Sequence, residues 1–155
     1  MGKRGITLIE LVTVMVIIAI GAVLVVPNIG VWMPRYRLRS ATRDIVSTMR
    51  TAQMRAVSSN VEYGVCFDTG ELSYTLYRRN TGGGWDKDGE AQKLPKGIEF
   101  NGVTLPTEPT LDNKPFAQFN PNSTSSSGNI LLKNPKGAQR RIVLLAPTGR
   151  VRIEE

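Results

Sequence analysis

Residues 3–27 read KRGITLIELVTVMVIIAIGAVLVVP, two cations and a glycine followed by a long apolar run. From Ile6 to Val26 the run holds 21 residues and one charge, that of Glu10. A helix rises about 1.5 Å per residue, so the run would measure roughly 30 Å, the thickness of a bilayer's hydrocarbon core. It therefore predicts a membrane-spanning helix. The cations before it predict a cytoplasmic N-terminus, with the chain after Pro27 on the other side.

Two simpler interpretations of this run leave Glu10 unexplained. A secretory signal peptide would be cut after Gly21, but its apolar region usually measures about 7–15 residues, and residues 22–26 continue the run here. A plain single-pass anchor has no use for a carboxylate, which costs about 2.5–3.5 kcal/mol at the bilayer centre. If the chain is cut after Gly5, the new amine of Ile6 could pair with Glu10 of a neighbouring copy. We therefore expect cleavage, an ion pair and self-assembly to depend on this one stretch.

The start of the run also resembles a known processing signal. Gly5 followed by Ile6-Thr7-Leu8-Ile9-Glu10 is similar to the class III signal of type IV pilins and type II secretion pseudopilins. The resemblance implies that a prepilin peptidase cuts after Gly5 and methylates the amine of Ile6. It also implies that Glu10, the fifth mature residue, sets the register of the subunit in a filament. Pro27 falls where many family members carry a helix-kinking proline, whereas Ile6 replaces their usual phenylalanine.

A second helical segment is predicted over residues 35–60. Its apolar residues recur every three or four positions and so mark one face: Leu38, Ala41, Ile45, Met49, Ala52 and Ala56. Arginines flank that face on both sides, Arg35, Arg39, Arg43 and Arg50 on one and Arg37 and Arg55 on the other. They could meet lipid headgroups, acidic loops of neighbouring subunits, or solvent alone. Between the two segments, Pro27, Gly30 and Pro34 are expected to interrupt the helix.

After residue 61 the apolar period changes to two, which is typical of strands. Two hairpins are predicted, within residues 62–77 and 141–153, with turns at Asp68–Glu71 and Ala146–Gly149. Shorter strands are expected at residues 97–100, 117–120 and 129–133, and loops at residues 104–115 and 122–127.

The predicted fold class is therefore α+β. A long N-terminal helix, transmembrane in its first half, should pack on an antiparallel β-sheet head. The expected parts are a cleaved leader (residues 1–5), a transmembrane and assembly helix (6–34), an amphipathic helix continuing into the head (35–60) and the β head (61–155).

Composition argues against catalysis. The chain has no histidine and one cysteine, Cys66, so Ser–His and Cys–His pairs and an internal disulfide are excluded, and zinc would lack its commonest ligand. We expect no enzyme activity, no small-molecule substrate and a buried, apolar role for Cys66. The net charge of +7 is concentrated in residues 35–55 and 130–155, a distribution that suits contact with phosphate, a membrane surface or another subunit.

Two groups of residues are candidate ligand sites. Alternating acids in a Gly-containing turn can offer several oxygens to calcium, although this turn lacks the full spacing of a calcium loop: Asp86, Asp88 and Glu90. No other metal or cofactor is expected. Arginines of the last hairpin could bind DNA phosphates through forked hydrogen bonds: Arg140, Arg141, Arg150 and Arg152. The alternative is an edge strand whose charges discourage aggregation.

Short motifs in the head resemble the GspH/FimT group of minor pseudopilins and minor pilins: Met54-Arg55-Ala56, Gly97-Ile98-Glu99-Phe100 and Gly149-Arg150-Val151-Arg152-Ile153. The resemblance implies a structural subunit of a type II secretion pseudopilus or a type IV pilus. Its partners would be other pilin subunits, the prepilin peptidase and the assembly platform of the bacterial inner membrane. It would wait in that membrane, single-pass with a periplasmic head, before entering the filament. The alternative is a DNA-binding minor pilin for DNA uptake, since the Gly-Arg-x-Arg stretch resembles a tail linked with DNA capture.

Overall fold

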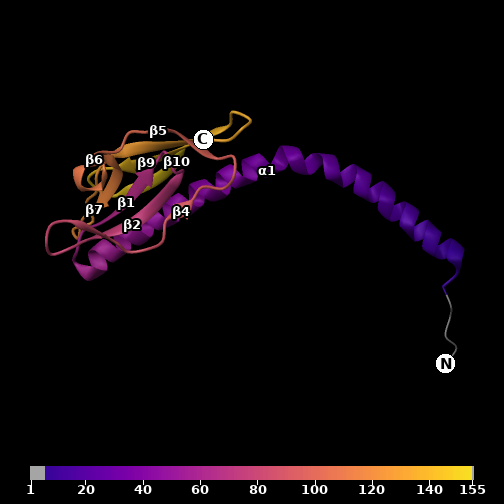
Figure 1. Cartoon of the computed structure of the whole chain (residues 1–155), viewed down its shortest axis with the longest axis horizontal. Coiled ribbons are helices and arrows are strands. Elements are labelled where there is room, and N and C mark those ends of the chain that lie inside the picture. The colour runs from indigo at the N-terminus through magenta and orange to yellow at the C-terminus, as the bar shows by residue number, and fades with distance from the viewer. Residues whose placement is uncertain (1–5, 155) are drawn as a thin grey trace, which may run out of the picture. The chain divides into compact units, whose positions relative to one another are not determined.

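A computed structural model describes residues 6–154 and, apart from residues 23–29 and 31, their side chains (Figure 1). The expected leader, residues 1–5, lies outside the described part. The chain forms two compact units, Met1–Met33 and Pro34–Glu155, and we call the second the head. The elements in chain order are α1 (Leu8–Ser59), β1 (Tyr63–Asp68), β2 (Ser73–Arg79), β3 (Trp85–Lys87), β4 (Gln92–Lys93), β5 (Glu99–Val103), β6 (Thr107–Glu108), the 3-10 helix η1 (Pro109–Leu111), β7 (Lys114–Phe119), β8 (Gly128–Lys133), β9 (Gln139–Leu145) and β10 (Arg150–Glu154).

Helix α1 runs without a break for 52 residues. The expectation that Pro27, Gly30 and Pro34 interrupt it is therefore wrong. A proline removes one backbone donor but holds φ near its helical value, so a helix with many turns on both sides can continue past it. None of the helical stretches with described side chains is both long and apolar enough to cross a membrane. The predicted span includes residues 23–29, whose side chains are not described.

The head contains two antiparallel sheets. The first has the strand order β3-β2-β1-β7-β6, with β4 also paired to β2, and the second has the order β10-β9-β8-β5. In the first sheet Val65 pairs with Leu76 on one side and with Ala117 on the other. In the second sheet Ile142 of β9 pairs with Ile130 of β8. Both predicted hairpins are present, as β1–β2 and β9–β10.

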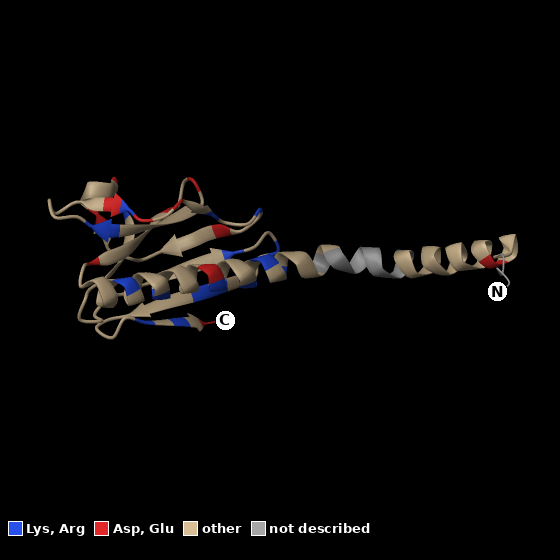
Figure 2. Ribbon diagram, turned by 90° about the horizontal axis from the view of Figure 1, so that it is seen from below, with Lys and Arg blue, Asp and Glu red and all other residues tan. Residues whose placement is uncertain are grey.

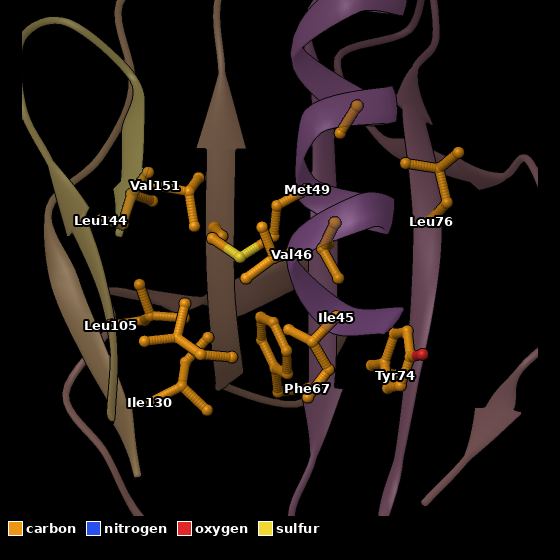
Figure 3. Packing of buried hydrophobic residues seen from close by; sticks show 14 of the residues in the cluster. Ile45, Val46, Met49, Phe67, Tyr74, Leu76, Leu105, Ile130, Leu144 and Val151 are labelled. Atoms are coloured by element: carbon orange, nitrogen blue, oxygen red, sulfur yellow. The ribbon is translucent and has the colours of Figure 1, made fainter. Parts of the chain in front are cut away.

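One core joins the second half of α1 to both sheets. Figure 3 shows Ile45, Val46 and Met49 of α1 between Tyr74 and Leu76 of the first sheet and Leu144 and Val151 of the second. All six residues of the predicted apolar face are buried: Leu38, Ala41, Ile45, Met49, Ala52 and Ala56. Three of them are alanines, whose small side chains let the helix approach the sheets closely. This part of the chain confirms the predicted packing of a helix on an antiparallel head.

The first sheet is also covered on its other face, by a smaller apolar cluster. Cys66, Tyr77, Trp85 and Phe116 are buried together there, and Leu111 of η1 packs against them. The Trp85 and Phe116 rings lie 4.5 Å apart, centroid to centroid. A side chain at Gly64 would run into the Phe116 ring, so β1 needs a glycine at this point. Apart from the burial of Cys66, this cluster was not predicted, because Trp85 and Leu111 come from a three-residue strand and a 3-10 turn that carry no apolar period.

Candidate processing and assembly site

The predicted assembly residue Glu10 lies in the first turn of α1 and forms a reciprocal cap with Thr7. Its Oε2 accepts hydrogen bonds from the Thr7 backbone N–H and from Thr7 Oγ1, both at 3.4 Å. In return, Thr7 Oγ1 accepts from the Glu10 backbone N–H at 3.3 Å. This is the capping-box arrangement, which satisfies two of the unpaired donors at a helix start. The spacing Thr-x-x-Glu is typical of a capping box, so this cap was predictable from the sequence. The prediction for Glu10 concerned only a partner in another subunit.

The residues around this cap are apolar and exposed. Eleven large apolar side chains from Ile6 to Ile20 are exposed, and Glu10 is exposed among them. A helix that is apolar on every side is stable when lipid or other helices surround it. The predicted processing residue Ile6 is one of the exposed residues, whereas Gly5 lies outside the described part of the chain.

The predicted arginine rows of α1 are exposed in the head: Arg35, Arg37, Arg39, Arg43, Arg50 and Arg55. Two of them hold loops of the head. Arg37 Nη1 donates to the Lys96 carbonyl oxygen at 3.2 Å. Arg55 Nη1 lies 2.6 Å from Asp88 Oδ2 and so ties the end of the helix to the acidic turn. The row formed by Arg37 and Arg55 therefore stabilises the head itself.

The acids of the calcium candidate have other partners. Asp88 is paired with Arg55, and Asp86 Oδ1 accepts a hydrogen bond from Asn80 Nδ2 at 3.0 Å. Asp86 lies in β3 with Trp85 and Lys87, whereas Asp88 and Glu90 follow that strand in the Gly-containing turn. Within residues 6–154, no group of three or more acidic or cysteine side chains is arranged to hold a metal ion. Calcium binding at Asp86, Asp88 and Glu90 remains a prediction.

Three of the four candidate DNA-binding arginines share one face of the second sheet. Arg150 and Arg152 of β10 pair with Leu145 and Val143 of β9, and Glu154 pairs with Arg141. Side chains alternate along a strand, so Arg141 lies on the same face as Val143 and Leu145. Arg140 lies on the other face, with the buried Ile142 and Leu144. In Figure 2 the ribbon beside the C-terminal label is coloured blue at the basic residues of β10.

Cys66 occupies a protected position in the smaller cluster. Burial raises the pKa of its thiol to about 11, so the thiolate is scarce at neutral pH and the side chain is a poor nucleophile. The predicted buried, apolar role is confirmed.

Comparisons with known proteins match both parts of the chain. Residues 41–149 match the family model described as type II transport protein GspH. Residues 1–26 match the prokaryotic N-terminal methylation motif. No curated protein matches.

The fold is similar to solved structures of three bacterial proteins. The minor pseudopilin EpsH from the type 2 secretion system of Vibrio cholerae is 13% identical, with a TM-score of 0.63 over 76% of this chain and 96% of that one. The type IV minor pilin FimU of Pseudomonas aeruginosa is 12% identical, with a TM-score of 0.60 over 80% of this chain and 92% of that one. GspH of E. coli is 14% identical, with a TM-score of 0.60 over 77% of this chain and 88% of that one.

The methylation motif, the N-terminal helix and the antiparallel head define a pilin-like protein. Within that class, the match over residues 41–149 covers most of the chain, and the chain belongs to the GspH family of type II transport proteins.

Proposed function

We propose that this chain is a minor pilin-like subunit of a type II secretion pseudopilus or a type IV pilus. A prepilin peptidase cuts it after Gly5 and methylates Ile6, and the subunit then assembles through its N-terminal helix. The observation that carries this proposal is the methylation motif over residues 1–26, joined to a head of the GspH family. The protein has no catalytic role of its own, and its partners are other pilin subunits, the peptidase and the assembly platform.

Before assembly the subunit resides in the bacterial inner membrane, with its N-terminus in the cytoplasm and its head in the periplasm. The exposed apolar side chains from Ile6 to Ile20 support this location, because water would surround them in a free monomer. In the filament, the same side chains pack against the helices of neighbouring subunits. Both environments keep water away from this part of α1.

Glu10 selects the register of that packing. Its Oε2, which accepts from Thr7 within the chain, is also the atom that the Ile6 amine of a neighbouring subunit would approach. In apolar surroundings an unpaired carboxylate is costly, so a register that brings an amine to Glu10 is favoured over one that does not. The amine exists only after cleavage, so processing precedes assembly.

The test of this proposal is the cleavage itself. Replacing Gly5 with a bulky residue should block processing, and the precursor should stay in the membrane about 0.5 kDa heavier, the mass of its first five residues. Mass spectrometry of the wild-type protein should show a methylated Ile6 at the start. An intact Met1 start in cells with an active prepilin peptidase would overturn the proposal.

The second candidate function is DNA binding during DNA uptake. It is favoured by the shared face of Arg141, Arg150 and Arg152 on neighbouring strands. Arginine guanidinium groups bind phosphates through two parallel hydrogen bonds, and three of them on one sheet face could follow one DNA backbone. Arg140, on the opposite face, is no longer part of this candidate surface.

A further inference from the structure

One end of the head gathers basic side chains from three segments. Arg35, Arg37 and Arg39 come from the first helical turns of the head, Lys96 from the turn before β5, and Lys136 from the turn between β8 and β9. All five are exposed. We call this set the basic collar.

Contacts hold these three segments together. Arg37 Nη1 donates to the Lys96 carbonyl oxygen at 3.2 Å, which joins the helix to the turn before β5. A Cβ atom at Gly97 would lie 3.0 Å from Pro135 Cγ, so the two turns touch. Each turn is closed by its own backbone hydrogen bond, from Ile98 N–H to the Pro95 carbonyl oxygen and from Gly137 N–H to the Asn134 carbonyl oxygen. The collar cations therefore project from a defined framework.

The charge of the collar is not neutralised by the acid beside it. Glu99 follows the first turn, but its Oε2 lies 3.5 Å from Lys133 Nζ, a cation outside the collar. In Figure 2 the ribbon of α1 is coloured blue at basic residues where the head begins. The collar thus presents a positive surface at this end.

Aromatic residues accompany the cations. Tyr36, between Arg35 and Arg37, is 55% exposed. Trp32, four residues earlier in α1, is 64% exposed. Tyrosine and tryptophan are enriched at membrane–water interfaces, and lysine and arginine next to an apolar segment are attracted to anionic lipids. The apolar run ends at Val26, nine residues before Arg35.

We propose that the basic collar binds anionic phospholipid headgroups and so holds the head of the unassembled subunit against the membrane surface. This inference rests on the proposed membrane anchor. The attraction is between charges near the surface, so salt should screen it. The head must release this contact when the subunit leaves the bilayer for the filament. An electrostatic contact at the membrane surface is weak enough to be released.

The test uses the full chain in nanodiscs and measures amide hydrogen exchange at Ile98 and Gly137, the amides that close the two collar turns. One set of nanodiscs holds phosphatidylcholine alone, and the other holds about 30% phosphatidylglycerol. We expect exchange to be at least about threefold slower in the anionic discs, and this difference to disappear at high salt. The double variant Lys96→Gln/Lys136→Gln should lose the difference.

A matched control removes two exposed cations elsewhere in the head. Arg78→Gln/Lys87→Gln alters β2 and β3 and should exchange like the wild type in both kinds of disc. Thermal unfolding of each variant checks that the head is folded.

The outcomes separate this proposal from the membrane anchor itself. A chain that stays in both kinds of disc, with equal exchange in each, overturns the collar proposal and leaves the anchor standing. If the collar variant then also fails to assemble, the collar is a subunit contact. A chain retained in neither kind of disc overturns the anchor and the collar together.

Discussion

Thr7 and Glu10 cap the start of α1 by exchanging hydrogen bonds, with Glu10 Oε2 3.4 Å from both the backbone nitrogen and Oγ1 of Thr7. The Thr7 N–H lies on the mature side of the expected cleavage point, so the same cap is available before and after processing. A neighbouring subunit's amine would compete with Thr7 for this carboxylate. Glu10 thus has an intramolecular partner, Thr7, with which the proposed intermolecular partner would compete.

The first prediction concerns this cap. Thr7→Ala removes the hydroxyl, and the first turn of α1 should lose about 1 kcal/mol of local stability. Amide exchange at Glu10, whose N–H donates to Thr7 Oγ1 at 3.3 Å, should become about fivefold faster. Thr7→Ser keeps the oxygen and should exchange like the wild type. Equal exchange in all three chains would show that the cap does not stabilise the helix start.

A second prediction follows from the ion pair between Lys114 of β7 and Asp68 at the end of β1, with Lys114 Nζ 2.7 Å from Asp68 Oδ2. The hydrogen bond from Lys114, aided by the backbone N–H groups of Glu71 and Gly70, lowers the pKa of the Asp68 carboxyl. A lowered folded-state pKa stabilises the fold above the unfolded pKa of about 3.9. That stability is lost as the pH falls through the folded-state value.

Lys114→Gln should therefore lower the melting temperature by about 1–3 °C at pH 7 and make little difference at pH 2. Thermal unfolding at the two pH values checks this. Lys87→Gln removes the same charge from β3 and serves as the control. A Lys114→Gln deficit that persists undiminished at pH 2 would mean that the side chain acts through packing and not through the Asp68 carboxylate.

A third prediction tests the smaller apolar cluster. Gly64→Ala places a methyl group against the Phe116 ring and should cost roughly 1–3 kcal/mol of unfolding free energy, the usual cost of overpacking. Gly102→Ala in β5 meets open space and should stay within about 0.5 kcal/mol of the wild type. Chemical denaturation of both variants gives the comparison. Equal stability would show that β1 tolerates a side chain at this position.

The DNA candidate makes a prediction about salt. Three phosphate contacts should give the logarithm of affinity a slope of about −3 against the logarithm of salt concentration. Arg150→Gln/Arg152→Gln should flatten that slope by about 2 and weaken binding to all sequences alike, because phosphate contacts do not read bases. Arg140→Gln, on the opposite face, should leave the slope unchanged. A mobility shift series measures it, and absence of binding at low salt would remove this function.

The parts of the fold that repeat with a regular period were predictable from the sequence. The buried face of α1 follows Leu38, Ile45 and Met49 at helical spacing, and β10 alternates polar and apolar residues. The strands β3, β4 and β6 have only two or three residues, too few to show a period. Their positions depend on tertiary contacts, as the burial of Trp85 beside Phe116 illustrates.

Some residues of the candidate sites were likewise predictable from the sequence, and others were not. A carboxylate within an apolar run made Glu10 a candidate from sequence alone, because the cost of the charge demands a partner, and its role in assembly stays a prediction. The separation of Arg140 from Arg141 required strand assignment, since neighbouring residues point to opposite faces only once both lie in β9. The collar could not be predicted, because the turns that carry Lys96 and Lys136 are brought together only through the pairing of β5 with β8.

The incorporation of a Glu10 variant into filaments tests the proposal that Glu10 directs assembly of a membrane-held subunit. Wild-type chain and Glu10→Val are produced in cells that build the filament, and the processed protein is quantified in membranes and in sheared filaments. Asp86→Asn, which alters a carboxyl group in the head, is the control. We expect Glu10→Val to be cleaved and to enter the membrane at least as well as the wild type, because a charge is removed from the apolar segment, but to be nearly absent from filaments. Incorporation of Glu10→Val into filaments at the wild-type level would contradict the proposal.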